Sequence, residues 1–409
     1  MCCVVLSLFI DICHCVCVKM SPIRVALVGL SQSAKTSWAA QGHLPYLLSP
    51  RGSSQYEIVA LHNSSVPAAE AARQSFALPP NVKAYGDPND LASDPDVDLV
   101  VCCTRVDTHA SSTGPSLRAG KAVFVEWPLV EDYDKAVALT GKKRLDNTII
   151  GLQGRVSPIV LKLKEVLKSG RIGRVLSSDV RAYGNLGMRG KFSEGLSYFA
   201  DQEVGGNHIT IAYGHTVDYV HEVLGEFSSF QSRMQIQRPV VKIIGKDGSE
   251  IEERSTNVPD LLTVHGKLAK GKADIVDDAT LSLTFRSGQQ FKGTPGFVWT
   301  INGELGEIMV TANGAYVHSD SYKDPIEIKL HDHVTDEVVD VNWDWEDWQK
   351  ELPYGSRIVA ELYERFAGWW RNGKPTGDLP EDQEWPRLHD AVVRMEELDE
   401  VFRQYDAQK

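Results

Sequence analysis

The sequence has little cysteine outside its first residues and no excess of positive charge. Five of the seven cysteines precede Met20, and the other two, Cys102 and Cys103, lie in an apolar run. This pattern does not suggest a disulfide framework and is typical of a protein in a reducing compartment. The formal net charge of -12 argues against nucleic acid or an anionic membrane as the main partner.

Residues 1–19 are apolar but lack the features of a signal peptide or a membrane span. The stretch has no basic start, Asp11 and His14 interrupt it, and it is too short to cross a bilayer. Its cysteines are too crowded to match a tetrahedral zinc ligand set, so we predict no metal site. We expect residues 1–19 to be a disordered or misassigned leader, and the protein to be cytoplasmic.

The first strong folding signal, at 23–34, lacks one glycine of a complete dinucleotide-binding fingerprint. An apolar run predicts a buried strand that ends at Gly29, and a helix is predicted at 38–48. Ser31 stands where the second glycine would be, and Ala34 can serve as the third small residue. A strand, a glycine turn and a helix hold a pyrophosphate at the helix N-terminus. The alternative is a tight turn that binds nothing.

The second predicted strand, at 56–61, lacks the acidic residue that reads a ribose hydroxyl. The residues that follow it are His62, Asn63, Ser64 and Ser65. Neutral side chains at these positions tolerate a 2′-phosphate, so the predicted cofactor is NAD or NADP. Ser64 or Ser65 can also simply cap the next helix, and both interpretations can hold.

Strands and helices alternate as far as residue 152, which predicts an open parallel sheet in a dinucleotide-binding domain at 20–153. Ligands of such sheets bind at the carboxyl ends of the strands. These ends carry Gly29, Asn63, Thr104, Glu126 and Gln153.

The pattern changes in the second predicted domain, 154–409. A helix capped by Ser157 and Pro158 is followed by strands separated by short turns, with one helix between them. The strands are predicted at 175–183, 228–236, 261–269, 279–285, 297–302 and 307–311, and two helices at 356–372 and 388–405. The predicted fold is therefore an α/β Rossmann domain plus an α+β domain with an open-faced, mostly antiparallel sheet.

The helix predicted at 207–224 carries the strongest chemical signal of the second domain. Helical spacing places Ile211, His215, Asp218 and Glu222 on one side, and His208 can share it. A histidine near a carboxylate can act as a general acid or base during hydride transfer. The alternative is a structural histidine at a domain interface.

These residues together resemble a known family. The motifs are the glycine turn, Thr104 with His109, Glu126-x-Pro128, and Gly205-Gly206 followed by His215 and Asp218. They resemble the glucose–fructose oxidoreductase, inositol dehydrogenase and rhizopine-catabolism family, which implies a Rossmann domain, an open-faced sheet and sugar-like substrates. The resemblance also implies a catalytic lysine and aspartate, but here Trp127 and Ile211 stand at those positions and only His215 remains.

Other strings resemble the branch of fungal galactose-regulon repressors, which are not enzymes. They are Phe124 to Trp127, Leu152 to Arg155 with Ser157-Pro158, Gly214 to Asp218, and Val258 to Asp260. This branch implies a bound dinucleotide, a dimer and a surface that captures an acidic activator segment.

Two hypotheses follow from the sequence. The first is an NAD(P)-dependent oxidoreductase with a small-molecule substrate, in which His215 is catalytic, assisted by Tyr213, Asp218 or Arg155. The second is a catalytically silent, dinucleotide-binding regulator with a protein partner, which could be nuclear. Both predict a homodimer formed through the sheet of the second domain. The expected cofactor-binding residues are Gly29, Ser31, Ala34, Asn63, Ser64, Thr104, His109, Glu126 and Trp127.

Overall fold

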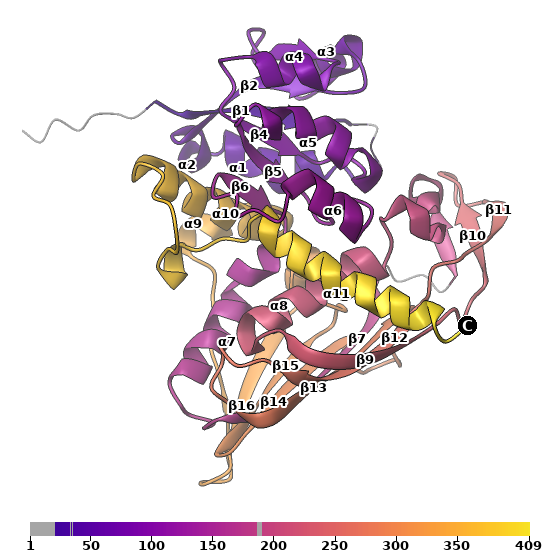
Figure 1. The fold of residues 1–409 in the computed structure, drawn as a ribbon, viewed down its shortest axis with the longest axis vertical. Coiled ribbons are helices and arrows are strands. Elements are labelled where there is room, and N and C mark those ends of the chain that lie inside the picture. The colour runs from indigo at the N-terminus through magenta and orange to yellow at the C-terminus, as the bar shows by residue number, and fades with distance from the viewer. Residues whose placement is uncertain (1–20, 33, 35, 186–189) are drawn as a thin grey trace, which may run out of the picture.

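The first part of the chain forms the predicted parallel sheet. The structure is a computed structural model that describes residues 21–32, 34, 36–185 and 190–409. Six parallel strands lie in the order β3-β2-β1-β4-β5-β6 (Figure 1). Their bounds are β1 Ile23–Val28, β2 Tyr56–His62, β3 Lys83–Tyr85, β4 Leu99–Cys102, β5 Ala122–Val125 and β6 Thr148–Ile150. The predicted open parallel sheet of a Rossmann domain is confirmed.

Helices cover this sheet because its strands are apolar on both faces. Every residue of β4 and β5 is buried, as expected of strands between two helical layers. The helices are η1 Ala39–His43, α1 Leu44–Leu48, α2 Pro50–Ser53, α3 Val66–Ser75, α4 Pro88–Ser93, α5 His109–Arg118 and α6 Tyr133–Thr140. The short β3 and α4 were not predicted.

The second sheet has eight strands in the order β17-β16-β15-β14-β7-β13-β12-β9. Its neighbours pair antiparallel except β7 and β13, which run parallel. The bounds are β7 Val175–Asn185, β9 Phe227–Gln235, β12 Leu261–Leu268, β13 Ile275–Ser287, β14 Phe297–Gly303, β15 Gly306–Ala312, β16 Ile326–Asp332 and β17 Glu337–Asp340. The predicted mostly antiparallel sheet is confirmed.

One face of this sheet is covered by helices α7 (Pro158–Lys168), α8 (Gly214–Leu224) and α11 (Leu388–Asp406), as Figure 1 shows. Burial alternates along β12, so successive side chains point to the helices and to solvent. Among the described residues, no helix lies on the other face in Figure 1. Helix α7 begins as predicted, because the Ser157 side chain accepts a hydrogen bond from the Val160 amide.

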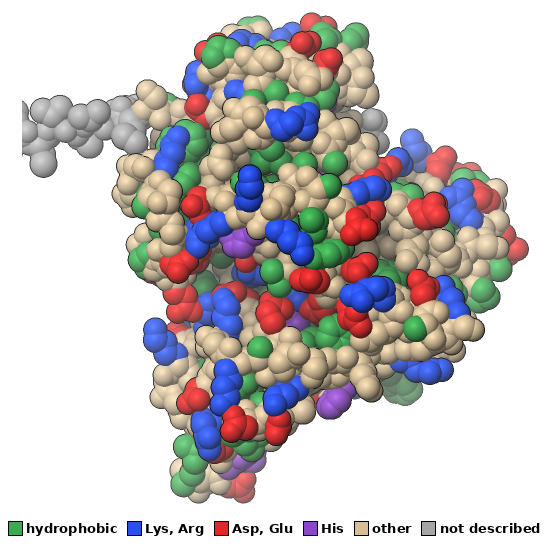
Figure 2. All heavy atoms as spheres, viewed as in Figure 1, with side chains coloured by type: hydrophobic (Ala, Val, Ile, Leu, Met, Phe, Trp, Pro, Cys, Tyr) green, Lys and Arg blue, Asp and Glu red, His purple; other side chains and the backbone are tan. Residues whose placement is uncertain are grey.

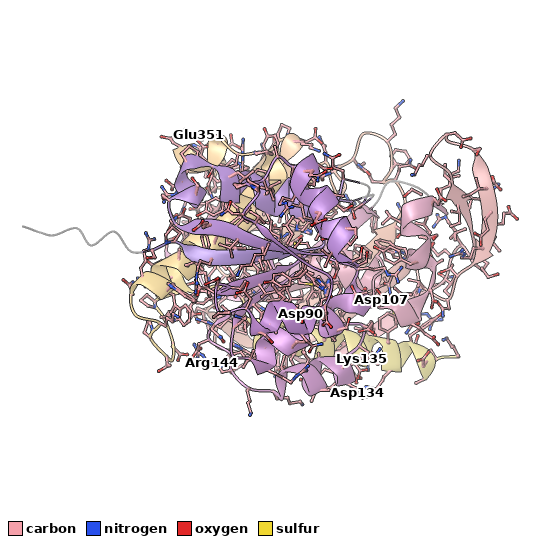
Figure 3. The ribbon with its side chains drawn as sticks, turned by 90° about the horizontal axis from the view of Figure 1, so that it is seen from above. Asp90, Asp107, Asp134, Lys135, Arg144 and Glu351 are labelled. Carbon is pink, nitrogen blue, oxygen red and sulfur yellow. The ribbon has the colours of Figure 1, made fainter. Side chains whose placement is uncertain are left out.

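The C-terminal helices return to the first domain. Helix α10 (Tyr354–Arg371) packs on η1, and α11 packs on α6. Asp134 and Lys135, labelled in Figure 3, belong to α6. Because these helices touch both parts of the chain, the boundary near residue 153 stays a prediction. The remaining elements are β8 (Lys191–Ser193), β10 (Val240–Ile244) and β11 (Glu250–Ser255), which form a small separate sheet, and α9 (Asp347–Lys350).

Acidic and basic side chains are interspersed on the face drawn in Figure 2. None of the helices in the described part of the chain is long and apolar enough to cross a membrane. The predicted leader, 1–19, lies outside the described residues.

Candidate functional site

Gly29 forms a tight turn directly after β1. Its φ is +89°, and a Cβ added there would lie 2.7 Å from Thr104 Cγ2 and 3.1 Å from the Cys103 carbonyl oxygen. The left-handed backbone and this close contact both require glycine. The turn therefore keeps the space at the carboxyl ends of β1 and β4 free of side chain, which fits the approach of a pyrophosphate.

The segment after Gly29 leads into a helix without a second glycine. The Ser31 carbonyl accepts a hydrogen bond from the Ser37 hydroxyl at 2.5 Å, and Ala34 is exposed. Trp38 and the π-helical turn η1 follow, and α1 continues the helix. The predicted helix at 38–48 is present, and its first turns have π-helical hydrogen bonds.

Asn63 links the end of β2 to the glycine turn. Its Nδ2 donates to the Leu30 carbonyl at 2.9 Å, while its Oδ1 is buried and unpaired among the described residues. An unpaired acceptor at the end of β2 fits a hydroxyl donor such as that of a ribose. Ser65, in contrast, caps α3 by accepting from the Ala68 amide, and Ser64 is exposed.

His109 positions loops at the ends of β4 and β5. Its Nε2 lies 3.0 Å from the Thr104 carbonyl oxygen, and its Nδ1 lies 3.0 Å from the carbonyl oxygen of Pro128. The ring is buried, and burial lowers its pKa. The Thr104 hydroxyl accepts from Thr108 at 2.8 Å. The buried His109 ring thus links the loops that follow β4 and β5.

Glu126, at the end of β5, is held by two residues that sequence analysis missed. His43 Nε2 lies 2.8 Å from Glu126 Oε1, and His43 Nδ1 lies 2.8 Å from the Tyr363 hydroxyl oxygen. His43 is fully buried. A Cβ at Gly151 would lie 2.5 Å from Glu126 Oε2. The carboxylate is therefore fixed between η1 and β6, and α10 supports it through Tyr363.

Trp127 is a packing residue between the two domains. Its side chain is buried, and Nε1 donates to the Thr210 carbonyl at 2.8 Å. A Cβ at Gly214 would lie 2.8 Å from the same nitrogen. The indole N–H is therefore already used, and the ring supports the start of α8.

Before α8, the π-helical turn η6 (Ile209–Tyr213) changes the spacing that sequence analysis assumed. A π-turn closes i→i+5 hydrogen bonds, so residues before and after it do not follow the 3.6-residue period. His208 accordingly points elsewhere: its Nε2 lies 2.6 Å from the Pro259 carbonyl oxygen. The expectation that His208 shares a side with His215 is wrong for this reason.

His215 lies in the first turn of α8, against a ring that sequence analysis also missed. Its centroid is 4.3 Å from that of His318, with planes 33° apart, and its Nδ1 has no partner within the described structure. Burial lowers the pKa of His215 to about 4, although the charges of Glu126 and Asp218 oppose this shift. The imidazole is therefore neutral near pH 7 and able to accept a proton.

Tyr213 and Asp218 belong to a buried ion network on another side of the helix. Arg155 donates two hydrogen bonds to Asp218, at 2.7 and 2.9 Å, and the Tyr213 hydroxyl donates to Glu397 at 3.0 Å. Asp218 lies close enough to His215 for its charge to act on the ring, but its carboxylate is engaged by Arg155, and the Tyr213 hydroxyl is engaged by Glu397. Their catalytic roles stay predictions, and we leave both out of the proposed site.

His221, Glu226 and Glu397 form the one cluster of possible metal ligands among the described residues. The guanidinium of Arg394 donates to Glu226 at 2.8 Å and also pairs with Glu397. This cation compensates the two carboxylates that a metal ion would need as ligands.

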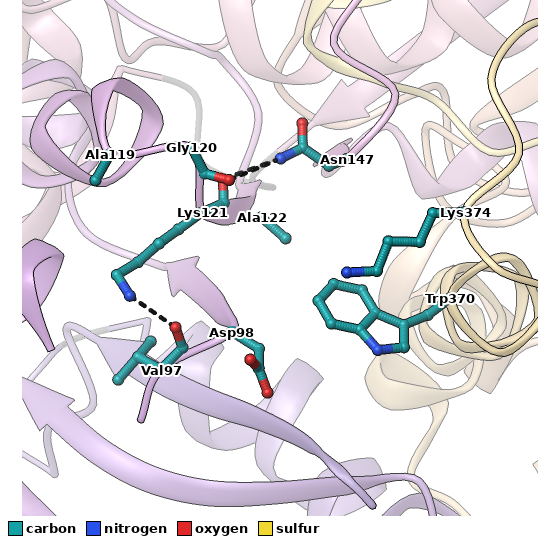
Figure 4. Close-up of a pocket in the computed structure, with 9 residues that line it drawn as sticks. All are labelled: Val97, Asp98, Ala119, Gly120, Lys121, Ala122, Asn147, Trp370 and Lys374. Atoms are coloured by element: carbon teal, nitrogen blue, oxygen red, sulfur yellow. Dashed lines mark hydrogen bonds between the residues drawn. The ribbon is translucent and has the colours of Figure 1, made fainter. Parts of the chain in front are cut away.

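A hollow of about 410 Å³ lies at the opposite, amino edge of the parallel sheet (Figure 4). Its lining is Val97, Asp98, Ala119, Gly120, Lys121, Ala122, Asn147, Trp370 and Lys374. The Lys121 ammonium is bonded to the Val97 carbonyl oxygen at 2.7 Å. Open parallel sheets bind cofactors at the carboxyl edge, so this hollow is not the dinucleotide site.

Comparison with known proteins gave two family matches. Residues 23–147 match the oxidoreductase family with an NAD-binding Rossmann fold, and residues 158–312 match the C-terminal domain of Gal80p. Dehydrogenase aclE of Aspergillus oryzae is 32% identical over 300 residues, covering 73% of this chain and 79% of that protein. The regulatory protein GAL80 of Saccharomyces cerevisiae is 28% identical over 307 residues, covering 72% and 68%.

Solved structures are similar over nearly the whole chain. A super-repressor mutant of Gal80p from Saccharomyces cerevisiae superposes with a TM-score of 0.81 at 24% identity, covering 95% of this chain and 97% of that one. A levoglucosan dehydrogenase in complex with NADH and L-sorbose gives 0.70 at 17% identity, covering 95% and 98%. At these identities the likeness shows the fold.

Proposed function

We propose that this chain, which belongs to the oxidoreductase family with an NAD-binding Rossmann fold, is an NAD(P)-dependent oxidoreductase. Its C-terminal domain is similar to that of Gal80p. It would transfer a hydride to or from a carbonyl or hydroxyl group of a small substrate. The observation that carries the proposal is His215, a buried, neutral imidazole close enough to Glu126 for its charge to act on the ring.

The dinucleotide would be held at the carboxyl edge of the first sheet, where it supplies or accepts the hydride. The glycine turn fits this group because a Cβ at Gly29 would fill the space beside Thr104. Asn63 Oδ1 would accept a hydrogen bond from a ribose hydroxyl. Glu126, fixed by His43, would border the end of the cofactor that faces His215.

His215 would move the substrate proton. A neutral imidazole accepts a hydroxyl proton during oxidation and returns it during reduction. Its low pKa favours the accepting form over the whole neutral pH range. The buried surroundings keep bulk water from competing for that proton.

A catalytically silent regulator is the second candidate, and Trp127 is the observation that favours it. Its only N–H is bonded to the Thr210 carbonyl, so it offers no free donor to a substrate oxygen. Under this proposal the dinucleotide would stabilise a surface for a protein partner, and the protein could act in the nucleus rather than the cytoplasm. In both cases we propose a homodimer through the open face of the eight-stranded sheet, testable by sedimentation.

The deciding experiment measures NADH and NADPH binding by calorimetry and turnover by absorbance with a panel of ketones and aldehydes. We expect His215→Ala to lower kcat about 10²–10⁴-fold with little change in cofactor affinity. The control is His333→Ala, which removes an exposed imidazole in the turn between β16 and β17. Turnover within about threefold of wild type in His215→Ala would make His215 structural. Cofactor binding without turnover on any substrate would favour the regulator.

A further inference from the structure

Within the described structure, His215 is restrained by a neighbouring ring and not by a hydrogen bond. Its imidazole centroid lies 4.3 Å from that of His318, with the ring planes 33° apart, and Tyr316 lies against His318 at 4.3 Å and 24°. Among the described residues, Nδ1 of His215 and Nδ1 of His318 are both buried without a hydrogen-bond partner. Ring packing is therefore the contact that holds the His215 side chain in place.

Four other buried histidines are fixed by hydrogen bonds. A ring nitrogen lies between 2.6 and 3.0 Å from a protein oxygen in His43, His109, His208 and His221. Such a bond sets the tautomer and the orientation of an imidazole. A group that moves a substrate proton must also be held in orientation, because the transfer requires hydrogen-bond reach. In His215 this restraint has to come from the packed ring of His318.

The segment that carries His318 is itself well anchored. It connects β15 to β16, and the short helix η7 (Ser319–Lys323) follows His318 directly. Val317 is fully buried, and the Tyr322 ring packs on the Trp345 ring with centroids 4.7 Å apart. Helix η7 also packs on α10. The backbone of His318 is therefore held on both sides, so its ring can support another side chain.

The titratable groups beside the two rings are Glu126 after β5, Asp218 and Tyr219 on α8, and the two imidazoles themselves. Both carboxylates raise the pKa of His215, but burial outweighs them and lowers it to about 4. Burial also lowers the pKa of His318, as does the nearby His215, and burial raises the pKa of the Tyr219 hydroxyl. The neutrality of the pair therefore depends on the exclusion of water.

We propose, building on the oxidoreductase function above, that His318 is a positioning residue: its ring orients the His215 imidazole and shields it from water. His318 acts through His215 and not on the substrate. Removing the ring would leave a polar space that water can enter, so the His215 imidazole would move more freely and become more basic. A phenyl ring would fill the same flat space and preserve both effects.

The first test needs no substrate, because NMR follows the titration of the His215 ring protons and the relaxation of its ring C–H groups. In His318→Ala we expect the pKa of His215 to rise from about 4 to about 5 or above. The order parameter of its ring should fall below about 0.6, the range of flexible groups. His318→Phe should keep the wild-type value of both quantities. An unchanged pKa and order parameter in folded His318→Ala would overturn the proposal.

His318→Leu is the second variant if His318→Ala does not fold. Leucine keeps most of the volume and excludes water but offers no flat ring. We expect it to leave the pKa of His215 near about 4 and to lower only the order parameter of the ring. A His215 ring that is as rigid in His318→Leu as in wild type would equally overturn the proposal.

The second test measures turnover with a substrate found in the panel of ketones and aldehydes. His318→Ala should lower kcat about 10- to 100-fold with KM within about twofold, because misplacement of a proton-transfer group affects the transition state. His318→Phe should keep kcat within about threefold. If His318→Phe loses as much turnover as His318→Ala, the unpaired His318 nitrogens contact the substrate and the positioning role is wrong.

The control is His333→Ala, in an exposed turn, which should match wild type in both tests. Absence of turnover in the wild-type protein would refute the oxidoreductase proposal, and the NMR measurements would still decide whether His318 positions His215. Turnover together with an unchanged His215 ring in His318→Ala would do the reverse.

Discussion

The two histidines of α8 lie six residues apart in opposite surroundings. His221 is buried among charges: Glu397 lies 3.1 Å away, and Nδ1 lies 2.7 Å from the Gly225 carbonyl oxygen. His215 is equally buried but stacks on another neutral imidazole, with an unpaired nitrogen among the described residues. In the first arrangement the charged groups lie within ion-pair distance of one another, although His221 Nε2 makes no hydrogen bond among the described residues. The second leaves the His215 Nδ1 atom without a partner among the described residues, so this nitrogen is available to a ligand.

The charged region joins three parts of the chain. Arg155, after β6, and Arg394, on α11, both contact Asp218 on α8. Burial raises the pKa of Glu226, but the charge of Arg394 outweighs it and lowers this pKa to about 2. The network therefore holds ionised groups in place, and it fixes the helix that carries His215.

The largest effect is expected from breaking this charged region. Arg394→Ala should lower the free energy of unfolding by about 3–5 kcal/mol, because it leaves the buried Glu397 and the half-exposed Glu226 without their cation. The measurement is urea denaturation at pH 7. Arg403→Ala, on the same helix but with an exposed partner, Asp399, should be indistinguishable from wild type. A similar small loss in both variants would show that the network is not a structural core.

Lowering the pH should reduce the free energy of unfolding through the buried, neutral His215. The unfolded chain protonates His215 near pH 6.5, whereas the folded protein does so only at about 4. Between these values the unfolded state binds more protons, so folded stability falls as pH falls. His215 alone accounts for about 3 kcal/mol over this window.

The measurement is urea denaturation at pH 6.5 and pH 4 for wild type and His215→Leu. The loss between the two pH values should be smaller in the variant by that amount. His333→Leu, in the turn between β16 and β17, serves as the matched exposed control. An equal loss in wild type and His215→Leu would contradict a buried, neutral His215.

Trp127→Phe tests the hydrogen bond between the first domain and η6, the turn before His215. It removes the hydrogen bond to the Thr210 carbonyl and should lower the free energy of unfolding by about 1–2 kcal/mol. Trp385→Phe is a matched control, because that buried indole donates to the Thr148 carbonyl at 2.8 Å. Both variants should lose similar stability, but only Trp127→Phe should lower turnover, since Thr210 lies in η6. Equal turnover in the two variants would show that Trp127 does not position His215.

Much of the fold follows from local sequence signals. The apolar runs of the first domain predict its parallel strands, Gly29 predicts the turn, and Ser157 predicts the cap of α7. Strands β10, β11, β16 and β17 were missed, and in the last of these every residue is exposed. Strand β17 has no buried face, so periodicity cannot identify it. Strands β10 and β16 do alternate, with buried apolar residues at 241 and 243 and at 326, 328 and 330, and this signal was overlooked.

The candidate site was predicted less completely, because its parts come from distant segments. His215 was found from its motif, but His43, Tyr363 and His318 reach the site only through tertiary packing. No spacing in the sequence connects them. The π-turn η6 also shifts the residues before His215, so helical spacing grouped side chains that the structure separates.

The smallest expected effect comes from introducing a carboxylate near the His215 ring. Ile211 is partly buried in η6, one turn before His215. Ile211→Asp places a carboxylate near the imidazole, and an opposite charge favours the protonated form. We expect the pKa of His215 to rise from about 4 by about half to one unit, equivalent to about 1 kcal/mol. The measurement is an NMR titration of the His215 ring protons. Ile211→Asn, which has the same size without the charge, should leave the titration where it is in wild type. If both variants titrate together, the change would come from altered packing, and the neutrality of this region would not depend on the apolar residue at 211.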